Sequence, residues 1–252
     1  MDGSSDSDYG VPIPGRILPP EQWAKTAIKR LPPPGSLDWK AIFGRKAPVA
    51  LDIGCGNGRY VIASALARLE VDHIGIEILP VVIRYATRRA NQRGLSNVRL
   101  AVIGGYEFLA QYVAPASLAE IHLYHPQPWK AERAVGNALR GVPGAAREHR
   151  RLITPEFLAL VHRSLNAGGL LVLQTDNRAY WQYIRRVLPL LFEFEELKVP
   201  WPDAPQGRTR REIYARKHKM AIFRGHARPR PELTADAIER IVRHAPRPDF
   251  QA

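Results

Sequence analysis

Short apolar runs alternate along this chain with segments in which apolar residues recur at helical spacing. From Val49 onward, the alternation is typical of strand–helix units that build a mostly parallel sheet. The predicted strands cover residues 49–53, 73–78, 98–103, 120–124 and 170–175. We therefore expect an α/β fold.

Residues that start and stop helices support this interpretation. Pro80 fits the first turn of one helix, whose apolar pattern stops at Gly94. Thr154 can cap a second helix, with Pro155 at its first helical position and Gly168 just past its end. The sequence thus predicts a helix after the second strand and another before the last one.

The regions around this core differ from it in composition. Residues 1–20 are rich in Ser, Asp, Gly and Pro, which predicts a disordered tail. An extension over 21–48 leads into one α/β domain over 49–227, and a tail over 228–252 contains a short helix near residues 234–244. Residues 131–148 are small and polar and predict an extended loop or a short helix.

The net charge points to a polyanionic partner. The 252 residues include 37 Lys and Arg against 24 Asp and Glu, a formal net charge of +13. Such a surface attracts phosphate, so nucleic acid is the expected partner. The charge is concentrated over residues 206–230, where one acid, Glu212, faces a basic set: Arg208, Arg210, Arg211, Arg216, Lys217, Lys219, Arg224, Arg228 and Arg230.

Other function classes are disfavoured by what the sequence lacks. Its apolar runs are strand-sized, so we expect no membrane span. The single cysteine, Cys55, supports neither a disulfide framework nor a thiolate metal site, and the histidines show no metal-ligand spacing. Because no apolar signal region follows Met1, we expect the cytoplasm.

A glycine-rich turn follows the first predicted strand. In DIGCGNG, residues 52–58, the strand ends in a carboxylate and turns through three glycines into a helix. Glycines let the backbone approach a ligand closely. The dinucleotide fingerprint G-x-G-x-x-G would require glycine where this chain has Arg59, which disfavours NAD and favours S-adenosylmethionine.

Two carboxylates lie at the ends of neighbouring strands. Asp52 can accept a hydrogen bond from the ammonium group of S-adenosylmethionine. Glu77 closes the next strand, where a carboxylate can accept both ribose hydroxyls. Alone, Asp52 also fits an acid favoured by the dipole at a helix start, and Glu77 fits a surface acid at a strand end. Together, one strand–helix unit apart, they predict a cofactor site.

At this point the chain resembles the tRNA (guanine-N7)-methyltransferase family, from about Trp39 to Phe223. The similarity includes the lead-in to the glycine turn, HIGIE at 73–77, IHLYHPQPWK at 121–130, the stretch from REHRR to QTDN at 147–177, and TRRE at 209–212. The resemblance implies a Rossmann-like class I fold: a mostly parallel seven-stranded sheet with helices on both faces. It also implies S-adenosylmethionine as cofactor and tRNA as substrate.

Carried over by position, the resemblance assigns residues to both ligands. The cofactor set is Asp52, Gly54, Gly56, Gly58 and Glu77, and the substrate set is Asp176, Thr209, Arg210, Arg211 and Glu212. Asp176 can alternatively cap the helix that contains Tyr180. Trp129 can stack on an extruded base or simply anchor the packing.

Several positions depart from the family. Gly104 and Gly105 replace an acid expected near the adenine, so backbone groups would hold that ring. Gln127 replaces the central acid of Pro-Asp-Pro-Trp and is the candidate catalytic residue, beside both cofactor and methyl acceptor. Lys130 is adjacent to the position of the family's lysine, which aligns with Ala131, and is assigned to the substrate.

These departures leave three functions open. The first is methyl transfer to guanine N7 in tRNA, and the second is methylation of another RNA site or a small molecule. A small substrate would not need the basic region at 206–230. The third is a catalytically silent RNA-binding subunit, which should not bind the cofactor. The oligomeric state, monomer or homodimer, does not follow from the sequence.

Overall fold

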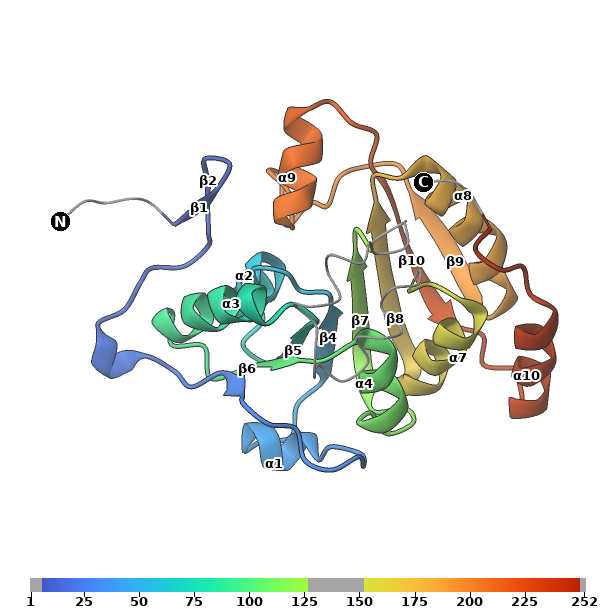
Figure 1. Cartoon of the computed structure of the whole chain (residues 1–252), viewed down its shortest axis with the longest axis horizontal. Helices are drawn as coiled ribbons and strands as arrows, with labels where there is room; N and C mark the ends of the chain where they lie inside the picture. Colours follow the sequence, from blue (N-terminus) through green and yellow to red (C-terminus); the bar gives the residue numbers. More distant parts are fainter. Residues whose placement is uncertain (1–5, 127–151, 250–252) are drawn as a thin grey trace.

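A sheet of eight strands forms the centre of the computed structural model, which describes residues 6–126 and 152–249 (Figure 1). The strands are β3 (Ala27–Ile28), β4 (Val49–Ile53), β5 (Asp72–Glu77), β6 (Val98–Val102), β7 (Leu118–Tyr124), β8 (Leu165–Thr175), β9 (Phe192–Leu197) and β10 (Phe223–Pro229). Their order is β3-β6-β5-β4-β7-β8-β10-β9. Neighbours from β3 to β8 are parallel, whereas β10 is antiparallel to β8 and β9.

Helices cover both faces of this sheet, as the sequence predicted. The helices are α1 (Trp39–Phe43), α2 (Arg59–Ala67), α3 (Pro80–Gln92), α4 (Gly105–Gln111), α7 (Pro155–Ser164), α8 (Arg178–Val187), α9 (Arg210–Lys217) and α10 (Ala235–His244), with 3-10 turns η1 (Pro20–Gln22) and η2 (Leu188–Leu190). Helices α2 and α3 pack on β5 and β6, and α7 and α8 pack on β8.

The two largest hydrophobic clusters among the described residues lie on opposite faces of the sheet. On the α2–α3 side, Ile62 and Ala86 pack with Leu100 of β6. On the α4–α7–α8 side, Phe108 and Phe157 belong to the larger cluster. Burying one leucine, isoleucine or phenylalanine side chain stabilises the fold by about 1.5–3 kcal/mol. The two clusters hold the carboxyl ends of the parallel strands at one edge, where ligands bind in such folds.

Most predicted elements are confirmed, and two details differ. All five predicted strands are present, and α10 begins after a capping Thr234 whose side chain accepts from the Ala237 amide. The sheet has eight strands rather than seven, because the two-residue β3 adds to its β6 edge. Helix α7 ends at Ser164, before the expected stop, so Gly168 lies inside β8 with φ +77°.

The amino-terminal residues differ from the expected disordered tail. Within residues 6–20, β1 (Ser7–Asp8) and β2 (Val11–Pro12) form a hairpin. Asp6 forms ion pairs with Arg89 and Arg93 of the α3 region, at 2.8 and 3.0 Å. The acids of this polar segment form ion pairs with arginines that are largely buried. These ion pairs hold the segment on the domain although it buries little apolar surface.

In residues 6–126 and 152–249, no helix is long and apolar enough to cross a lipid bilayer. The predicted loop over 131–148 lies outside the described residues.

Candidate active site

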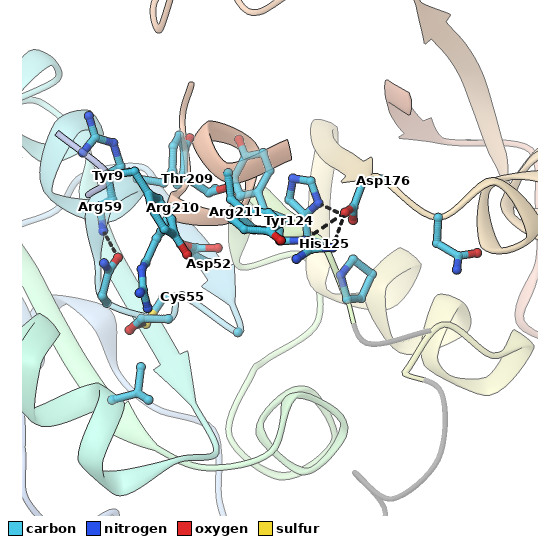
Figure 2. Close-up of a pocket in the computed structure, with 18 of the residues that line it drawn as sticks. Tyr9, Asp52, Cys55, Arg59, Tyr124, His125, Asp176, Thr209, Arg210 and Arg211 are labelled. Carbon is cyan, nitrogen blue, oxygen red and sulfur yellow. Dashed lines mark hydrogen bonds and ion pairs between the residues drawn. The ribbon is translucent and has the colours of Figure 1, made fainter. Parts of the chain in front are cut away.

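A cavity of about 640 Å³ opens at the carboxyl ends of β4, β7 and β8. It brings together segments far apart in the sequence: the hairpin, the glycine turn, the residues after β7 and β8, and α9 (Figure 2). Of the predicted site residues, it is lined by Asp52, Gly54, Gly56, Asp176, Thr209, Arg210 and Arg211. One cavity therefore combines part of the predicted cofactor set with most of the predicted substrate set.

The glycine turn presents open backbone to this cavity. Gly54 and Gly56 have φ of +73° and +54°, and a Cβ on either would meet no atom within 4 Å. Gly58 has a different role, because a Cβ there would lie 2.9 Å from the Ala86 Cβ of α3. The first two glycines thus border the ligand space, and the third permits α2 and α3 to pack closely.

Asp52 is a buried carboxylate with unused hydrogen-bonding capacity. It is 4 % exposed, and its Oδ1 has no hydrogen-bond partner among the described residues. Burial and, secondarily, the nearby Glu77 raise the pKa of Asp52 to about 8. An ammonium group would satisfy this oxygen and compensate its charge, so the residues present fit the amino-acid end of S-adenosylmethionine.

Glu77 and the glycines after β6 lie outside the cavity lining. Glu77 Oε2 accepts from the Gly56 amide at 3.2 Å, and Oε1 accepts from the amides of Ile78 and Leu79. Burial raises the pKa of Glu77, although these hydrogen bonds oppose the shift. Glu77 therefore holds the glycine turn in place, and its contact with the ribose stays a prediction.

Gly104 and Gly105 begin α4. Gly104 is the N-cap of the helix, and a Cβ on Gly105 would lie 2.5 Å from Cγ2 of Ile53. Close packing against β4 thus explains why position 105 is glycine. Their proposed backbone contacts with adenine stay a prediction.

Asp176 is held from two sides at the end of β8. Its Oδ1 accepts from His125 Nδ1 at 3.0 Å, and its Oδ2 accepts from Nε and Nη2 of Arg211 at 2.9 and 2.5 Å (Figure 2). Burial opposes ionisation, but these hydrogen bonds outweigh it and lower the pKa of Asp176 to about 2. The alternative role as helix cap is wrong, because Asn177 caps α8 by accepting from the Tyr180 amide.

The tautomer of His125 follows from its other neighbour. Gln174 Oε1 accepts from Trp201 Nε1 at 2.6 Å and from Arg224 Nε at 3.2 Å, and both of these groups can only donate. The Gln174 amide nitrogen therefore points at His125 Nε2, 3.0 Å away, and donates to it. The imidazole proton must lie on Nδ1, which donates to Asp176. Nothing in the sequence pattern singled out His125.

Helix α9 supplies the basic side of the cavity. Thr209 caps the helix by accepting from the Glu212 amide at 3.1 Å. The Arg211 guanidinium lies 5.0 Å from the Tyr214 ring centroid. Glu212 is fully buried, and its carboxylate is occupied by the Arg208 amide and by the side chains of Arg216 and Arg224. The assignment of the Glu212 side chain to the substrate therefore needs correction, since it stabilises α9 from inside.

The hairpin contributes residues that sequence analysis missed. Asp8 accepts from Asn57 Nδ2 at 2.7 Å and pairs with Arg59 at 3.3 Å, which ties the hairpin to the glycine turn. Tyr9 lines the cavity and lies 5.6 Å from the Tyr214 ring of α9. An acid and an aromatic residue in a polar tail gave no signal because their partners are about 50 and 200 residues away.

Three predicted residues belong to the segment that follows His125 and Pro126 in the sequence. Gln127, Trp129 and Lys130 lie outside the described residues, although Pro126 and His125, which directly precede them, line the cavity. Within the described ranges, no group of three or more His, Cys, Asp or Glu side chains could hold a metal ion.

Comparisons with known proteins agree with this geometry. The family described as "Putative methyltransferase" matches residues 46–226. The tRNA (guanine-N(7)-)-methyltransferase of Shewanella woodyi is 32% identical over 202 residues, which covers 79% of this chain and 79% of that protein. The enzyme of the same name from Mycolicibacterium gilvum is 32% identical over 186 residues, which covers 71% of this chain and 65% of that protein.

A solved structure supports the fold. A 16S rRNA (adenine(1408)-N(1))-methyltransferase variant from Catenulisporales acidiphilia, with its cosubstrate S-adenosylmethionine, superimposes with a TM-score of 0.50 and 14% identity. The alignment covers 80% of this chain and 96% of that one. Fold and site together define a class I, S-adenosylmethionine-dependent methyltransferase. More particularly, the chain belongs to the tRNA (guanine-N7)-methyltransferase family.

Proposed function

We propose that this protein transfers the methyl group of S-adenosylmethionine to N7 of a guanine in tRNA. The observation that carries the proposal is the single cavity in which Asp52 and the glycine turn meet the ion pair between Asp176 and Arg211. The names of the relatives support the same reaction. Because tRNA is the proposed substrate, we place the activity in the cytoplasm.

The chemistry requires little acid–base assistance. Guanine N7 has an unprotonated lone pair, so its attack on a methyl group needs no strong general base. Orientation and electrostatics then supply most of the acceleration. The base becomes cationic as the methyl group arrives, and the ionised Asp176 carboxylate stabilises that charge. Asp176 stays ionised near neutral pH because its pKa is lowered to about 2.

The exposed cations of α9 fit the RNA backbone. The Arg210 side chain is 61% exposed, and its guanidinium lies 5.2 Å from the Tyr9 ring centroid. Arginine pairs well with phosphate oxygens, and such contacts position RNA without reading its sequence. Arg210 therefore binds RNA phosphate at the rim of the cavity. Lys130, which follows Pro126 in the sequence, is assigned to the substrate as well.

Nucleoside analysis tests the function directly. Purified protein is incubated with labelled S-adenosylmethionine and bulk tRNA, and the tRNA is digested to nucleosides. We expect label in 7-methylguanosine. Label in a different nucleoside would contradict the proposed acceptor, and tight RNA binding without cofactor binding would indicate a silent RNA-binding subunit. The variant Asp176→Asn controls for a contaminating methyltransferase.

His125 is expected to position Asp176 for the tRNA. The variants His125→Asn and His125→Asp differ little in size, and both residues tolerate the φ of +52° at this position. Asn keeps a donor toward Asp176, whereas Asp places a second carboxylate against it. We expect His125→Asp to lower kcat/KM for tRNA at least tenfold and His125→Asn to retain most of it. Steady-state kinetics measure this, with the exposed His244→Asn as control.

The affinity for S-adenosylmethionine shows whether a His125 variant only mispositions Asp176 or disturbs the whole site. It should be unchanged in both His125 variants, because Asp52 and the glycine turn are untouched. Equal losses in His125→Asn and His125→Asp would mean that the donated hydrogen bond does not matter.

Gln127 is expected to limit turnover on guanine. An acid at this position could accept from the guanine amino edge and favour the cationic product, whereas Gln127 contributes no charge. We expect Gln127→Asp to raise the turnover of tRNA guanine at least tenfold, and the neutral Gln127→Asn serves as the matched control. Formation of 7-methylguanosine over time measures the effect. An unchanged or lower rate in Gln127→Asp would argue that the side chain of residue 127 does not lie beside the methyl acceptor.

A further inference from the structure

A second cavity, of about 740 Å³, lies between α3, the β3–β6 edge of the sheet and residues 23–31. We name it the edge groove. It shares no lining residue with the candidate active site. In Figure 1, β6 lies toward the left of the sheet, whereas α10 lies to the right of the sheet.

All charged residues that line the edge groove are cations. Its lining contains Lys29, Arg30, Arg84 and Arg88 and no Asp or Glu. All four are exposed, and none forms an ion pair or a side-chain hydrogen bond with another described residue. By contrast, Arg89 on the same helix pairs with Asp6. Four uncompensated charges around one concave surface attract a polyanion strongly.

An exposed aromatic ring borders the same surface. Trp23 is 40% exposed, and its Nε1 donates to the Leu18 carbonyl at 2.8 Å, which fixes the indole. No described aromatic ring stacks on it. A fixed aromatic ring beside a basic groove is the arrangement that binds unpaired nucleotides, with bases stacked on the ring and phosphates on the cations.

The backbone that carries these residues is tied to the domain. The Ala24 amide donates to the Asn91 carbonyl at 3.0 Å, and the Leu100 amide donates to the Thr26 carbonyl at 2.8 Å. The Asn91 side chain accepts from both the amide and the hydroxyl of Thr26. Trp23 and Lys29 are therefore held on a firm platform beside α3.

Helix α3 connects the edge groove to the active site. Val82, in its first turn, lines the active-site cavity, whereas Arg84 and Arg88 line the edge groove. The rise along a helix places residues 82 and 88 about 9 Å apart. A single RNA can span this distance with its target base in the active site.

We propose that the edge groove is a second RNA-binding surface, which holds an unpaired nucleotide and its phosphates from the tRNA whose guanine is methylated. The inference rests on the proposed function for the identity of the RNA. The cations bind phosphate, Trp23 stacks on a base, and the groove thereby aligns the substrate without taking part in methyl transfer.

Paired charge-removal variants test the groove. Arg84→Gln/Arg88→Gln removes two groove cations, and Arg240→Gln/Arg243→Gln removes two exposed cations of α10 as a matched control. Fluorescence anisotropy with a tRNA transcript measures binding at several salt concentrations. We expect about tenfold weaker binding and a salt slope smaller by roughly 1.4 for the groove variant. Losses of equal size in both variants, or none in the groove variant, would overturn the proposal.

The stacking partner is tested separately. Trp23→Ala should weaken tRNA binding about fivefold or more with an unchanged salt slope, and Trp23→Phe should recover most of it. Thermal melting confirms that each variant folds, and S-adenosylmethionine affinity should be unchanged in all of them. Equal binding by Trp23→Ala and the parent protein would contradict the stacking role. If the parent protein binds tRNA but forms no 7-methylguanosine, the proposed function fails while the groove is still tested by binding.

Discussion

Asp52→Asn is expected to weaken S-adenosylmethionine binding by roughly 10- to 150-fold at pH 8. A hydrogen bond to a charged group contributes about 1.5–3 kcal/mol, and the substitution removes the charge while it keeps the size. Isothermal titration calorimetry measures the affinity. Asp236→Asn, in the exposed first turn of α10, removes an acid without touching the site and should bind as the parent does.

The pH dependence makes this prediction more specific. Because the pKa of Asp52 is raised to about 8, the carboxyl is mostly protonated at neutral pH and must lose its proton to pair with an ammonium group. Affinity should rise close to tenfold per pH unit below about pH 7. It should fall again above about pH 8, where the α-amino group of the ligand loses its own proton. Asp52→Asn should lose the acidic limb and keep the alkaline one.

Two independent readouts check the linkage. At pH 7, binding by the parent protein should release most of a proton, which calorimetry detects in buffers of different ionisation enthalpy. The ligand-free protein should also become less stable as pH rises between about 4 and 8, because folded Asp52 binds its proton more tightly than the unfolded chain does. A parent protein whose affinity does not change between pH 5.5 and 7 would disprove the role of Asp52.

Glu212→Ala is expected to cost about 3–5 kcal/mol of unfolding free energy, or roughly 6–20 °C in Tm. The fully buried carboxylate accepts from the Arg208 amide at 2.9 Å and from Arg216 and Arg224, the latter with its side chain 6% exposed. Its removal leaves the Arg224 guanidinium buried without its acid. Differential scanning calorimetry measures the loss.

A double variant distinguishes the cost of leaving the Arg224 cation without its acid from the cost of the packing lost with the Glu212 side chain. Glu212→Ala/Arg224→Met removes both members of the buried pair and should recover part of the lost stability, since a hydrophobic side chain replaces the uncompensated cation. The exposed Glu239→Ala of α10 serves as control and should change Tm little. A Glu212→Ala protein that melts like the parent would show that α9 does not depend on this carboxylate.

Local sequence signals predicted the central part of the fold well. The all-buried run VALDI became β4 with the predicted ends, and Pro80 begins α3 as expected. Strands β9 and β10 were missed because FEFEEL and FRGHARP mix charged with apolar residues. Each gains its place through antiparallel pairing with a distant strand.

The sequence by itself determined where the candidate cofactor turn lies, and the tertiary structure decided which other residues share its cavity. Asp52 and the glycine turn are contiguous, so spacing alone reveals them. The hydrogen bonds of Asp176 with His125, and the burial of Glu212, join elements distant along the chain. Residue periodicity reports which face of one element is apolar, but side-chain partners depend on how the elements pack. That packing buries Glu212, a predicted substrate residue, inside the protein and places His125, which no motif singled out, in the lining of the candidate active site.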